Sequence, residues 1–245
     1  MSWNLTRRHF LTATGSALAL PGLSRQLFVG PALRLSNGQR ILFQGDSITD
    51  CGRDRSAATG NTGGGLGTGY PLLIAAALLK AKSTAGLEFV NRGVSGDRVP
   101  DLAKRWEADT VNLRPDVLSI LVGVNDFWHR LFRGYTGTVS DYAAQYAELL
   151  AATKRALPRV RLVLLEPFVL RTGVVDGRWF PEFDERRAAA ARVASDAGAT
   201  WIPLQQMFDD LSKEAPASWW VSDGVHPTPA GHAAIADAWM QAVSL

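Results

Sequence analysis

Short apolar runs alternate with longer amphipathic segments along most of this 245-residue chain, and this alternation restricts the fold more than any other feature. Most of the runs are rich in Val, Ile, Leu or Phe and lack a polar residue at every second position. That pattern is typical of strands covered on both faces. Five runs are predicted as strands: Arg40–Gln44, Leu87–Asn91, Val117–Val122, Val160–Leu165 and Thr200–Ile202.

Helical patterns fill the intervals between these strands. Alternation of strands and helices favours an α/β fold, in which an open parallel sheet carries helices on both sides. No repeat, long linker or change of composition follows residue 30, so we expect residues 31–245 to form a single domain. The segments predicted as helices are Pro71–Lys82, Val99–Asp109, Ser140–Leu157, Glu182–Ala197 and Pro229–Val243.

Composition excludes several classes of protein. The chain is 47% hydrophobic and 20% charged, so it has enough apolar material for a core and is not intrinsically disordered. Cys51 is the one cysteine, which rules out an internal disulfide and a cysteine-based zinc or iron–sulfur site within one chain. The net charge of +3 comes from a leader that holds three arginines and no acid, so nucleic acid is not an expected partner.

Residues 1–30 have the pattern of a targeting segment. Arg7 and Arg8 stand before a short, weakly apolar stretch from Thr12 to Leu20. Paired arginines in this position predict a twin-arginine signal and export to the periplasm or beyond. The alternative is a short surface helix or an unstructured start. The stretch is too short to cross a membrane, which takes about 20 apolar residues, and we expect no membrane span elsewhere.

The residues that follow the predicted strands carry reactive side chains. In open parallel sheets, sites form beyond the carboxyl ends of the strands. Gly45-Asp46-Ser47 follows the first strand, a glycine-containing segment with Gly96 follows the second, and Gly123-Val124-Asn125-Asp126 follows the third. Asp223-Gly224-Val225-His226-Pro227 precedes the last predicted helix. These segments therefore meet at one edge of the sheet if the fold is as predicted.

A serine, a histidine and an aspartate in this arrangement suit nucleophilic catalysis. The hydroxyl of Ser47 is a weak nucleophile that needs a general base, and neutral His226 can accept its proton near pH 7. Asp223, three residues before His226, can hold the second ring nitrogen. The backbone N–H groups of Ser47 and Gly96 and the side-chain amide of Asn125 are suitable donors to an oxyanion.

Three other histidines compete for the role of base. His9 lies in the leader, and His232 lies within the last predicted helix, where a structural or surface role is expected. His129 lies close to Asn125 in sequence and is the more serious rival. We favour His226 because only this histidine has an aspartate at a short fixed spacing and a helix start directly behind it, with Thr228 as its cap.

At this point the sequence resembles the SGNH, or GDSL-type, hydrolases. Their four blocks occur in order here, as the segments that contain Ser47, Gly96, Asn125 and His226. The resemblance implies a three-layer α/β/α sandwich with a five-stranded parallel sheet, a flavodoxin-like arrangement, and ester hydrolysis. It assigns Ser47 as nucleophile, Asp223 and His226 as the rest of the triad, and Ser47, Gly96 and Asn125 as the oxyanion hole.

Flanking residues are similar to the acetylxylan-esterase branch of these hydrolases. The similar segments are Gly45–Cys51, Gly65–Tyr70, Arg105–Glu107 and Asn125–Trp128. This branch removes acetyl groups from sugar hydroxyls and tends to form oligomers, so the resemblance implies an oligosaccharide or small ester as substrate and leaves a homo-oligomer open.

Aromatic side chains near the reactive segments fit a sugar site. Trp128 follows Asn125, and Trp219 and Trp220 precede Asp223, where indole rings can stack on sugars. Packing in the core is the alternative for each of them. Trp106, Trp201 and Trp239 fall within regular elements and are expected to be core. Phe127–Thr138, which holds Trp128, is interpreted as an aromatic loop.

Two further segments could suggest a ligand. The glycine-rich stretch 59–69 lacks the spacing of a nucleotide-binding loop, so we interpret it as a flexible loop over the edge of the sheet. Asp50, Arg53, Asp54 and Arg55 form a charged cluster without a histidine, which favours a salt-bridged loop over a metal site. We therefore expect neither a metal nor a cofactor.

The leading hypothesis is an exported carbohydrate O-acetylesterase. A lysophospholipase or thioesterase of the same fold is the alternative among enzymes, and it requires a long apolar groove. A sugar-binding protein without catalysis is the alternative from another class. The intact serine, histidine and aspartate argue against this last reading, because binding alone does not need them.

Overall fold

The computed structural model describes residues 28–30, 32–57 and 59–244, so the predicted export signal lies outside the described residues. The strands are β1 (Leu33–Arg34), β2 (Arg40–Gly45), β3 (Glu88–Asn91), β4 (Val117–Leu121), β5 (Arg161–Leu165), β6 (Thr200–Ile202) and β7 (Val243–Ser244). The α-helices are α1 (Ser47–Asp50), α2 (Gly63–Leu66), α3 (Tyr70–Ala81), α4 (Val99–Asp109), α5 (Val124–Phe132), α6 (Val139–Ala156), α7 (Glu182–Asp196), α8 (Leu204–Leu211), α9 (Ala217–Trp220) and α10 (Pro229–Ala242). Two 3₁₀ turns, η1 (Val111–Leu113) and η2 (Gly177–Trp179), complete the description.

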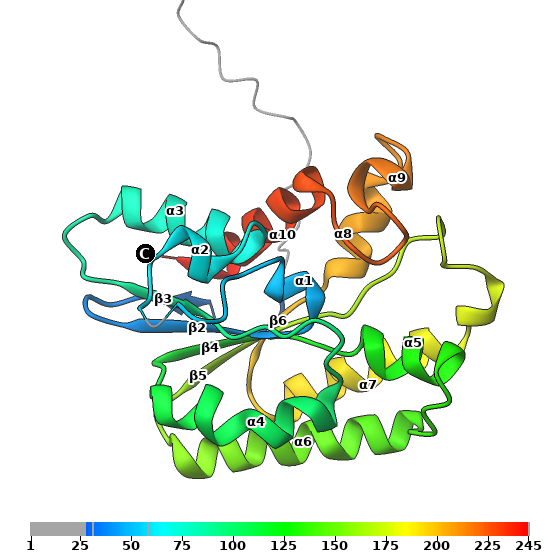
Figure 1. Ribbon diagram of the computed structural model, residues 1–245, viewed down its shortest axis with the longest axis horizontal. Helices are drawn as coiled ribbons and strands as arrows, with labels where there is room; N and C mark the ends of the chain where they lie inside the picture. Colours follow the sequence, from blue (N-terminus) through cyan, green and yellow to red (C-terminus); the bar gives the residue numbers. More distant parts are fainter. Residues whose placement is uncertain (1–27, 31, 58, 245) are drawn as a thin grey trace, which may run out of the picture.

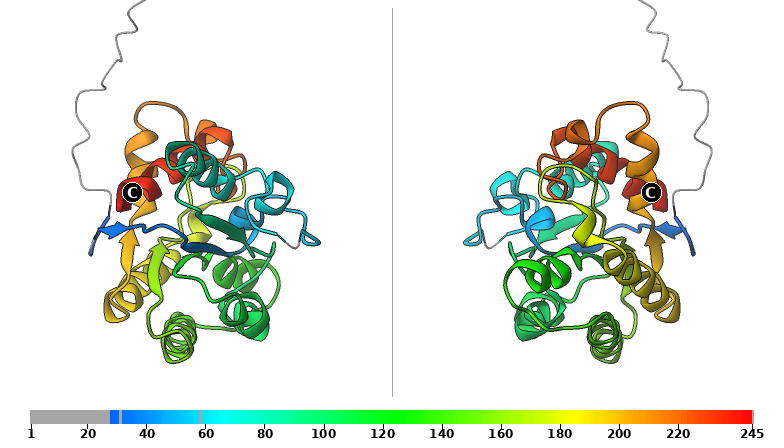
Figure 2. Two further views of the ribbon diagram at one scale, coloured as in Figure 1. Left: turned by 90° about the vertical axis from the view of Figure 1, so that its left-hand side faces the viewer. Right: turned by 90° about the vertical axis from the view of Figure 1, so that its right-hand side faces the viewer.

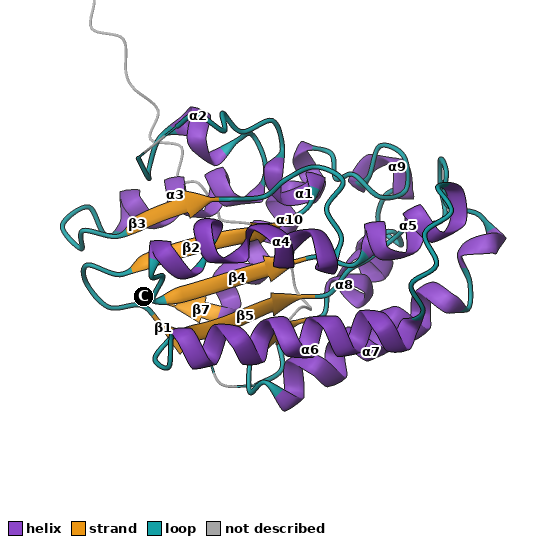
Figure 3. Cartoon of the chain, turned by 60° about the horizontal axis from the view of Figure 1, so that its bottom comes forward, coloured by secondary structure: helices purple, strands orange, loops and turns teal. Residues whose placement is uncertain are grey.

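The main sheet has five strands in the order β3-β2-β4-β5-β6, and all neighbours are parallel. This confirms the predicted α/β fold with a five-stranded parallel sheet. A separate two-stranded pair, β1 with β7, joins the start and the end of the described chain. Figure 3 shows the arrowheads of β2, β4 and β5 pointing to the same edge, beside α1 and α5. The loops that follow these strands therefore gather at that edge.

Helices cover both faces of the sheet, which gives three layers (Figures 1 and 2). Alternate residues of one strand serve opposite cores: Ile41 and Phe43 of β2 pack with α3 and α10, whereas Leu42 packs with α4 and α6. Both faces of a strand are thus apolar, which explains why the strand sequences show no alternation. Trp106, Trp201 and Trp239 are buried as predicted.

Several short elements were not predicted. The stretch Phe127–Thr138 was interpreted as a loop, but its first part belongs to α5. The glycine-rich segment contains the single-turn helix α2, whose N-cap Thr62 accepts a hydrogen bond from Gly65 N. This segment does lie along the edge of the sheet, because Asn61 bonds the backbone of Phe89 on the edge strand β3 and of Leu87 just before it. Helices of one turn carry too few residues to show a period.

Candidate active site

Ser47 stands at a sharp turn between β2 and α1. Gly45 has a φ of +154°, and a Cβ there would lie 2.2 Å from Leu121 O and 2.4 Å from Thr49 Oγ1. Only glycine fits this position, because any side chain would collide with the neighbouring strand. The carboxylate of Asp46 then caps α1 by accepting a hydrogen bond from Ile48 N at 3.0 Å. Together these two residues direct Ser47 outward at the carboxyl edge of the sheet.

Ser47, His226 and Asp223 form a hydrogen-bonded row. Ser47 Oγ lies 2.9 Å from His226 Nε2, and His226 Nδ1 lies 2.7 Å from Asp223 Oδ2. A carboxylate only accepts hydrogen bonds, so Nδ1 carries the ring proton and Nε2 is left to accept from the serine hydroxyl. The structure thus brings the three residues of the predicted triad together in the order that nucleophile, base and orienting group require.

The aspartate is itself held in place by backbone donors. Its Oδ1 accepts hydrogen bonds from Val225 N at 3.0 Å and from His226 N at 2.8 Å. Partial burial acts to raise the pKa of Asp223, but these bonds and the one from the His226 ring outweigh it and lower the pKa below its usual value. Asp223 therefore stays ionised and can balance the positive charge that develops on His226.

The rival histidines are placed elsewhere. His232 Nδ1 accepts a hydrogen bond from Tyr70 N at 3.2 Å, and its Nε2 lies 3.4 Å from Cys51 Sγ. Burial lowers the pKa of His232 to about 4, so this imidazole is a neutral structural group. His129 lies on α5, and no hydrogen bond joins it to Ser47 in the described chain. Among the histidines that the structure describes, only His226 is hydrogen-bonded to the serine.

The three donors predicted for the oxyanion hole lie on loops at the carboxyl edge of the sheet. The backbone N–H groups of Ser47 and Gly96 donate no hydrogen bond to another group of the described chain. Gly96 has a φ of +88° in the loop after β3, and Val94 N donates to Gly45 O at 3.0 Å, which fastens that loop to β2. Asn125 Nδ2 donates to Asp97 O at 3.2 Å, which fixes the amide and leaves its other N–H free.

Arg105 of α4 joins the parts that carry these donors, although its role was not predicted. Its Nε donates to Asp97 Oδ2 at 2.7 Å, its Nη1 to Arg92 O at 2.7 Å, and its Nη2 to Gly45 O at 3.4 Å. One guanidinium thus ties the ends of β2 and β3 to the Gly96 loop. The sequence showed Arg105 only as part of a family-like segment, because its three partners lie on separate segments that meet only in the fold.

We expect Arg105→Ala to lower kcat on a small ester about 10- to 100-fold while KM changes little. The reason is that small displacements of aligned catalytic groups have effects of this size. Arg105→Lys should recover only part of the rate, because an ammonium cannot reproduce the fork of the guanidinium. Exposed Lys104→Ala on the same helix is the control. Steady-state kinetics that showed a rise in KM alone would contradict a positioning role.

The three candidate tryptophans have different environments. The ring of Trp128 lies 5.9 Å from that of His226 and 5.7 Å from that of buried Trp179, so it borders the triad. Trp219 is 62% exposed. Trp220 packs against the core, and its Nε1 donates to Leu211 O at 3.1 Å, so its N–H is not available to a sugar. Of the three, Trp128 borders the triad, Trp219 is exposed and Trp220 is anchored to the core.

Two buried aspartates flank the site. Asp46 is 1% exposed and Asp126 is fully buried. Burial raises the pKa of Asp46 to about 7, although the bond from Ile48 N opposes it. Burial likewise raises the pKa of Asp126 to about 7, against the opposing effects of Val99 N and of nearby guanidinium groups. Asp126 accepts hydrogen bonds from Val99 N, at 3.2 and 3.3 Å, and so holds the start of α4 beside Asn125.

Asp126 should make stability depend on pH. Its pKa is raised in the folded state, so the folded chain binds more protons than the unfolded chain between about pH 4 and 7. The stabilisation that comes from the raised pKa of Asp126 is complete below about pH 4 and is lost as the pH rises to about 7. Between pH 4 and 8 the wild type should lose up to about 4 kcal/mol of unfolding free energy through this group, and Asp126→Asn should lack this loss. The measurement is the unfolding free energy of both proteins across that pH range. Parallel curves would contradict the assignment.

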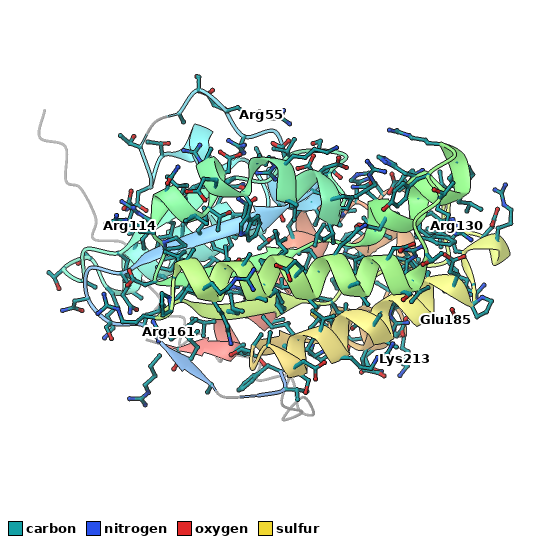
Figure 4. All side chains as sticks on the ribbon, turned by 90° about the horizontal axis from the view of Figure 1, so that it is seen from below. Arg55, Arg114, Arg130, Arg161, Glu185 and Lys213 are labelled. Atoms are coloured by element: carbon teal, nitrogen blue, oxygen red, sulfur yellow. The ribbon has the colours of Figure 1, made fainter. Side chains whose placement is uncertain are left out.

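The charged segment after Ser47 holds one of the expected ion pairs, between Asp50 and Arg55, whereas Arg53 donates to Gly93 O and Asp54 accepts from Ser56. Arg55 Nη2 lies 2.6 Å from Asp50 Oδ2, and the same carboxylate accepts from Ser95 N and Ser95 Oγ at 2.9 Å. Figure 4 shows Arg55 on the loop at the edge of the molecule. Among the described residues, no group of three His, Cys, Asp or Glu side chains is arranged to hold a metal ion. None of the described helices has the length and apolar content needed to cross a membrane.

The fold and this site define an ester hydrolase of the α/β/α type, and comparisons identify its family. The model of the GDSL-like lipase/acylhydrolase family matches residues 43–234, so this chain belongs to that family. It is a carboxylic ester hydrolase by this membership and by its similarity to acetylxylan esterase from Geobacillus stearothermophilus. That relative is 31% identical over 213 residues, which cover 86% of this chain and 96% of the relative.

Solved structures agree with this assignment. A Parabacteroides merdae protein described as a GDSL-like lipase is 46% identical, with a TM-score of 0.85, and the match covers 86% of this chain and 98% of that one. The structure of the Geobacillus stearothermophilus acetylxylan esterase is 32% identical, with a TM-score of 0.75 and coverage of 84% and 94%. Both matches extend over nearly the whole length of the relatives.

Proposed function

We propose that this protein is a serine esterase that removes O-acetyl groups from carbohydrates. The observation that carries the proposal is the hydrogen-bonded row from Ser47 Oγ through His226 to Asp223. Similarity to an acetylxylan esterase supports the acetyl and carbohydrate parts. Two catalytic mutants of that Geobacillus enzyme have been solved, one with a serine and one with a histidine replaced by alanine, which supports the same pair of roles here.

The proposed reaction proceeds in two steps. Ser47 Oγ attacks the ester carbonyl while His226 Nε2 takes the hydroxyl proton, and the resulting oxyanion accepts hydrogen bonds from Ser47 N, Gly96 N and Asn125 Nδ2. His226 then passes its proton to the departing sugar oxygen as the carbon–oxygen bond breaks, which leaves an acetyl group on Ser47. Water attacks this acetyl-enzyme, His226 takes a proton from the water and returns it to Ser47 Oγ, and acetate leaves.

The length of the acyl chain distinguishes this proposal from a lipid-directed enzyme of the same family. A small acyl pocket should give kcat/KM values that fall from acetate through butyrate to octanoate esters of p-nitrophenol, because excess methylenes clash. A long apolar groove should give the reverse order, because each buried methylene contributes about 0.8 kcal/mol. Preference for octanoate, with no acetate released from acetylated xylan, would refute the carbohydrate acetylesterase. Failure of Ser47 to react with a serine-directed phosphonate would instead favour a binding protein.

Export through the twin-arginine pathway is part of the same proposal. It rests on Arg7 and Arg8 in the leader and on the absence of acidic residues around them. If the proposal is correct, replacing both arginines by lysine should leave folded, active enzyme in the cytoplasm. Unchanged export of that variant would refute the pathway.

A further inference from the structure

A second hollow, separate from the triad, lies beyond the carboxyl ends of β5 and β6. It has a volume of about 460 Å³, within the range of small-molecule sites. Its walls come from the segment 169–171 after β5, from Phe180 and α7, from α8 with the adjoining Ser212, and from the start of α9. Figure 1 shows α7 and α8 on opposite faces of the sheet, with the chain after β5 running between them. Ser47, Asp223 and His226 do not line this cavity.

Charged side chains in the cavity use only some of their hydrogen-bonding atoms on neighbouring residues. Arg187 bonds Glu166 Oε1 at 3.0 Å and Asp184 Oδ1 at 2.6 Å, which leaves its Nη2 without a partner in the described chain. Asp209 accepts a hydrogen bond on Oδ1 from Gln205 Nε2 at 2.9 Å. Its Oδ2 is left to accept further bonds. A donor on Arg187 and an acceptor on Asp209 thus remain available, and both side chains are held by their other hydrogen bonds.

Arg171 is the least constrained of these groups. It forms no ion pair with any described residue, and its guanidinium lies 3.8 Å from the centre of the Phe180 ring. Stacking on the ring fixes the plane of the guanidinium and leaves its N–H groups for a ligand. The hydroxyl of Ser212 is buried without a hydrogen-bond partner, and rotation about its Cα–Cβ bond can turn it toward the cavity that the residue lines.

The balance of these groups indicates the class of ligand. Arg171 and Arg187 supply two positive charges, and Asp184 and Asp209 supply two negative charges. Glu166, bonded to Arg187, adds a third carboxylate next to this wall, so the walls present both signs of charge and give an anion no net attraction. A neutral molecule with adjacent hydroxyl groups can donate to the carboxylates and accept from the guanidinium groups at the same time. A pyranose ring has this chemistry.

We propose that this cavity is a second carbohydrate subsite, which holds a neutral pyranose unit of the polysaccharide that carries the ester. The inference rests on the proposed function. Leu170 N donates to Gly224 O and Val174 N donates to Asp223 O, both at 2.9 Å, so the segment that walls the cavity also supports the triad loop. A sugar chain held here raises the effective concentration of its acetyl groups near Ser47.

Direct binding tests the subsite. The full chain with Ser47→Ala, which cannot turn over an ester, is titrated with xylotetraose by calorimetry. Adding Arg171→Ala should abolish one binding event or weaken it at least tenfold. Arg192→Ala, an exposed arginine of α7 outside the cavity, is the matched control and should leave binding unchanged. Binding of xylotetraose that is equal in the Arg171→Ala and Arg192→Ala backgrounds would overturn the proposal.

Hydrolysis separates the subsite from the proposed function. In the otherwise wild-type enzyme, Arg171→Ala should raise KM on acetylated xylan about tenfold and leave kinetics on p-nitrophenyl acetate unchanged, because the small ester does not reach the cavity. An equal loss on both substrates would overturn the subsite, since it indicates a structural role. If wild type releases no acetate from acetylated xylan, the proposed function fails, whereas the xylotetraose titration still decides whether the cavity binds sugar.

Discussion

Replacing Ser47 or His226 by alanine should lower kcat about 10⁴- to 10⁶-fold on p-nitrophenyl acetate, with little change in KM. Losses of this size follow removal of the nucleophile or base in unrelated serine hydrolases, because what remains is binding and oxyanion stabilisation alone. Here the two groups are 2.9 Å apart, and among the described residues no other histidine is hydrogen-bonded to the serine hydroxyl, so we expect no second base to take over.

The same experiment ranks the other triad member and the rival base. Asp223→Asn should cost about 10⁴-fold, because an amide in place of the carboxylate no longer fixes the proton on Nδ1. His129→Ala should stay within about tenfold of wild type. Near wild-type turnover by Ser47→Ala, or equal losses for His129→Ala and His226→Ala, would contradict the assignment. Circular dichroism of each variant controls for folding.

The sequence predicted the strands and the reactive segments of the site because both depend on local residue patterns. The five strands of the main sheet were recognisable as apolar runs, and the reactive segments follow them or precede the last helix. Ser47 and His226 are 179 positions apart, yet each sits beside a glycine or an aspartate that defines its local geometry. Parallel strands then bring such segments to one edge without further information.

The parts that could not be predicted depend on contacts between distant segments. Arg105 acts through Gly45, Arg92 and Asp97, and nothing in its own neighbourhood indicates that these three groups meet. Trp219 and Trp220 are adjacent in sequence, but one is exposed and the other is anchored to Leu211. The second cavity combines α7, α8 and the segment after β5. In each case the packing of whole elements decides the role of the side chain.

Asn125→Ala should lower kcat about 10²- to 10³-fold, the largest effect expected outside the triad. A single oxyanion donor is worth this much in other hydrolases, since it stabilises the charge that develops in the transition state and contributes little to binding the neutral ester. KM should therefore change little, and the loss should be the same for acetate and butyrate esters. Asn125 is 6% exposed, and its amide is fixed by the bond to Asp97 O, so the donor is oriented before substrate arrives.

The substitution also removes that bond to Asp97, as does Asn125→Asp, so both variants measure the loss of every N–H that the Asn125 side chain donates. Asn125→Asp keeps the shape of the side chain but has no N–H to donate when it is ionised, and it places a negative charge beside the oxyanion. It should be at least as slow as Asn125→Ala. Asn125→Gln retains an amide one methylene further out and should recover little, because the donor must lie about 3 Å from the oxyanion. If Asn125→Asp retained most of the wild-type kcat at pH 8, neither the side-chain donor nor its bond to Asp97 O would be needed, and the two backbone N–H groups of Ser47 and Gly96 would suffice.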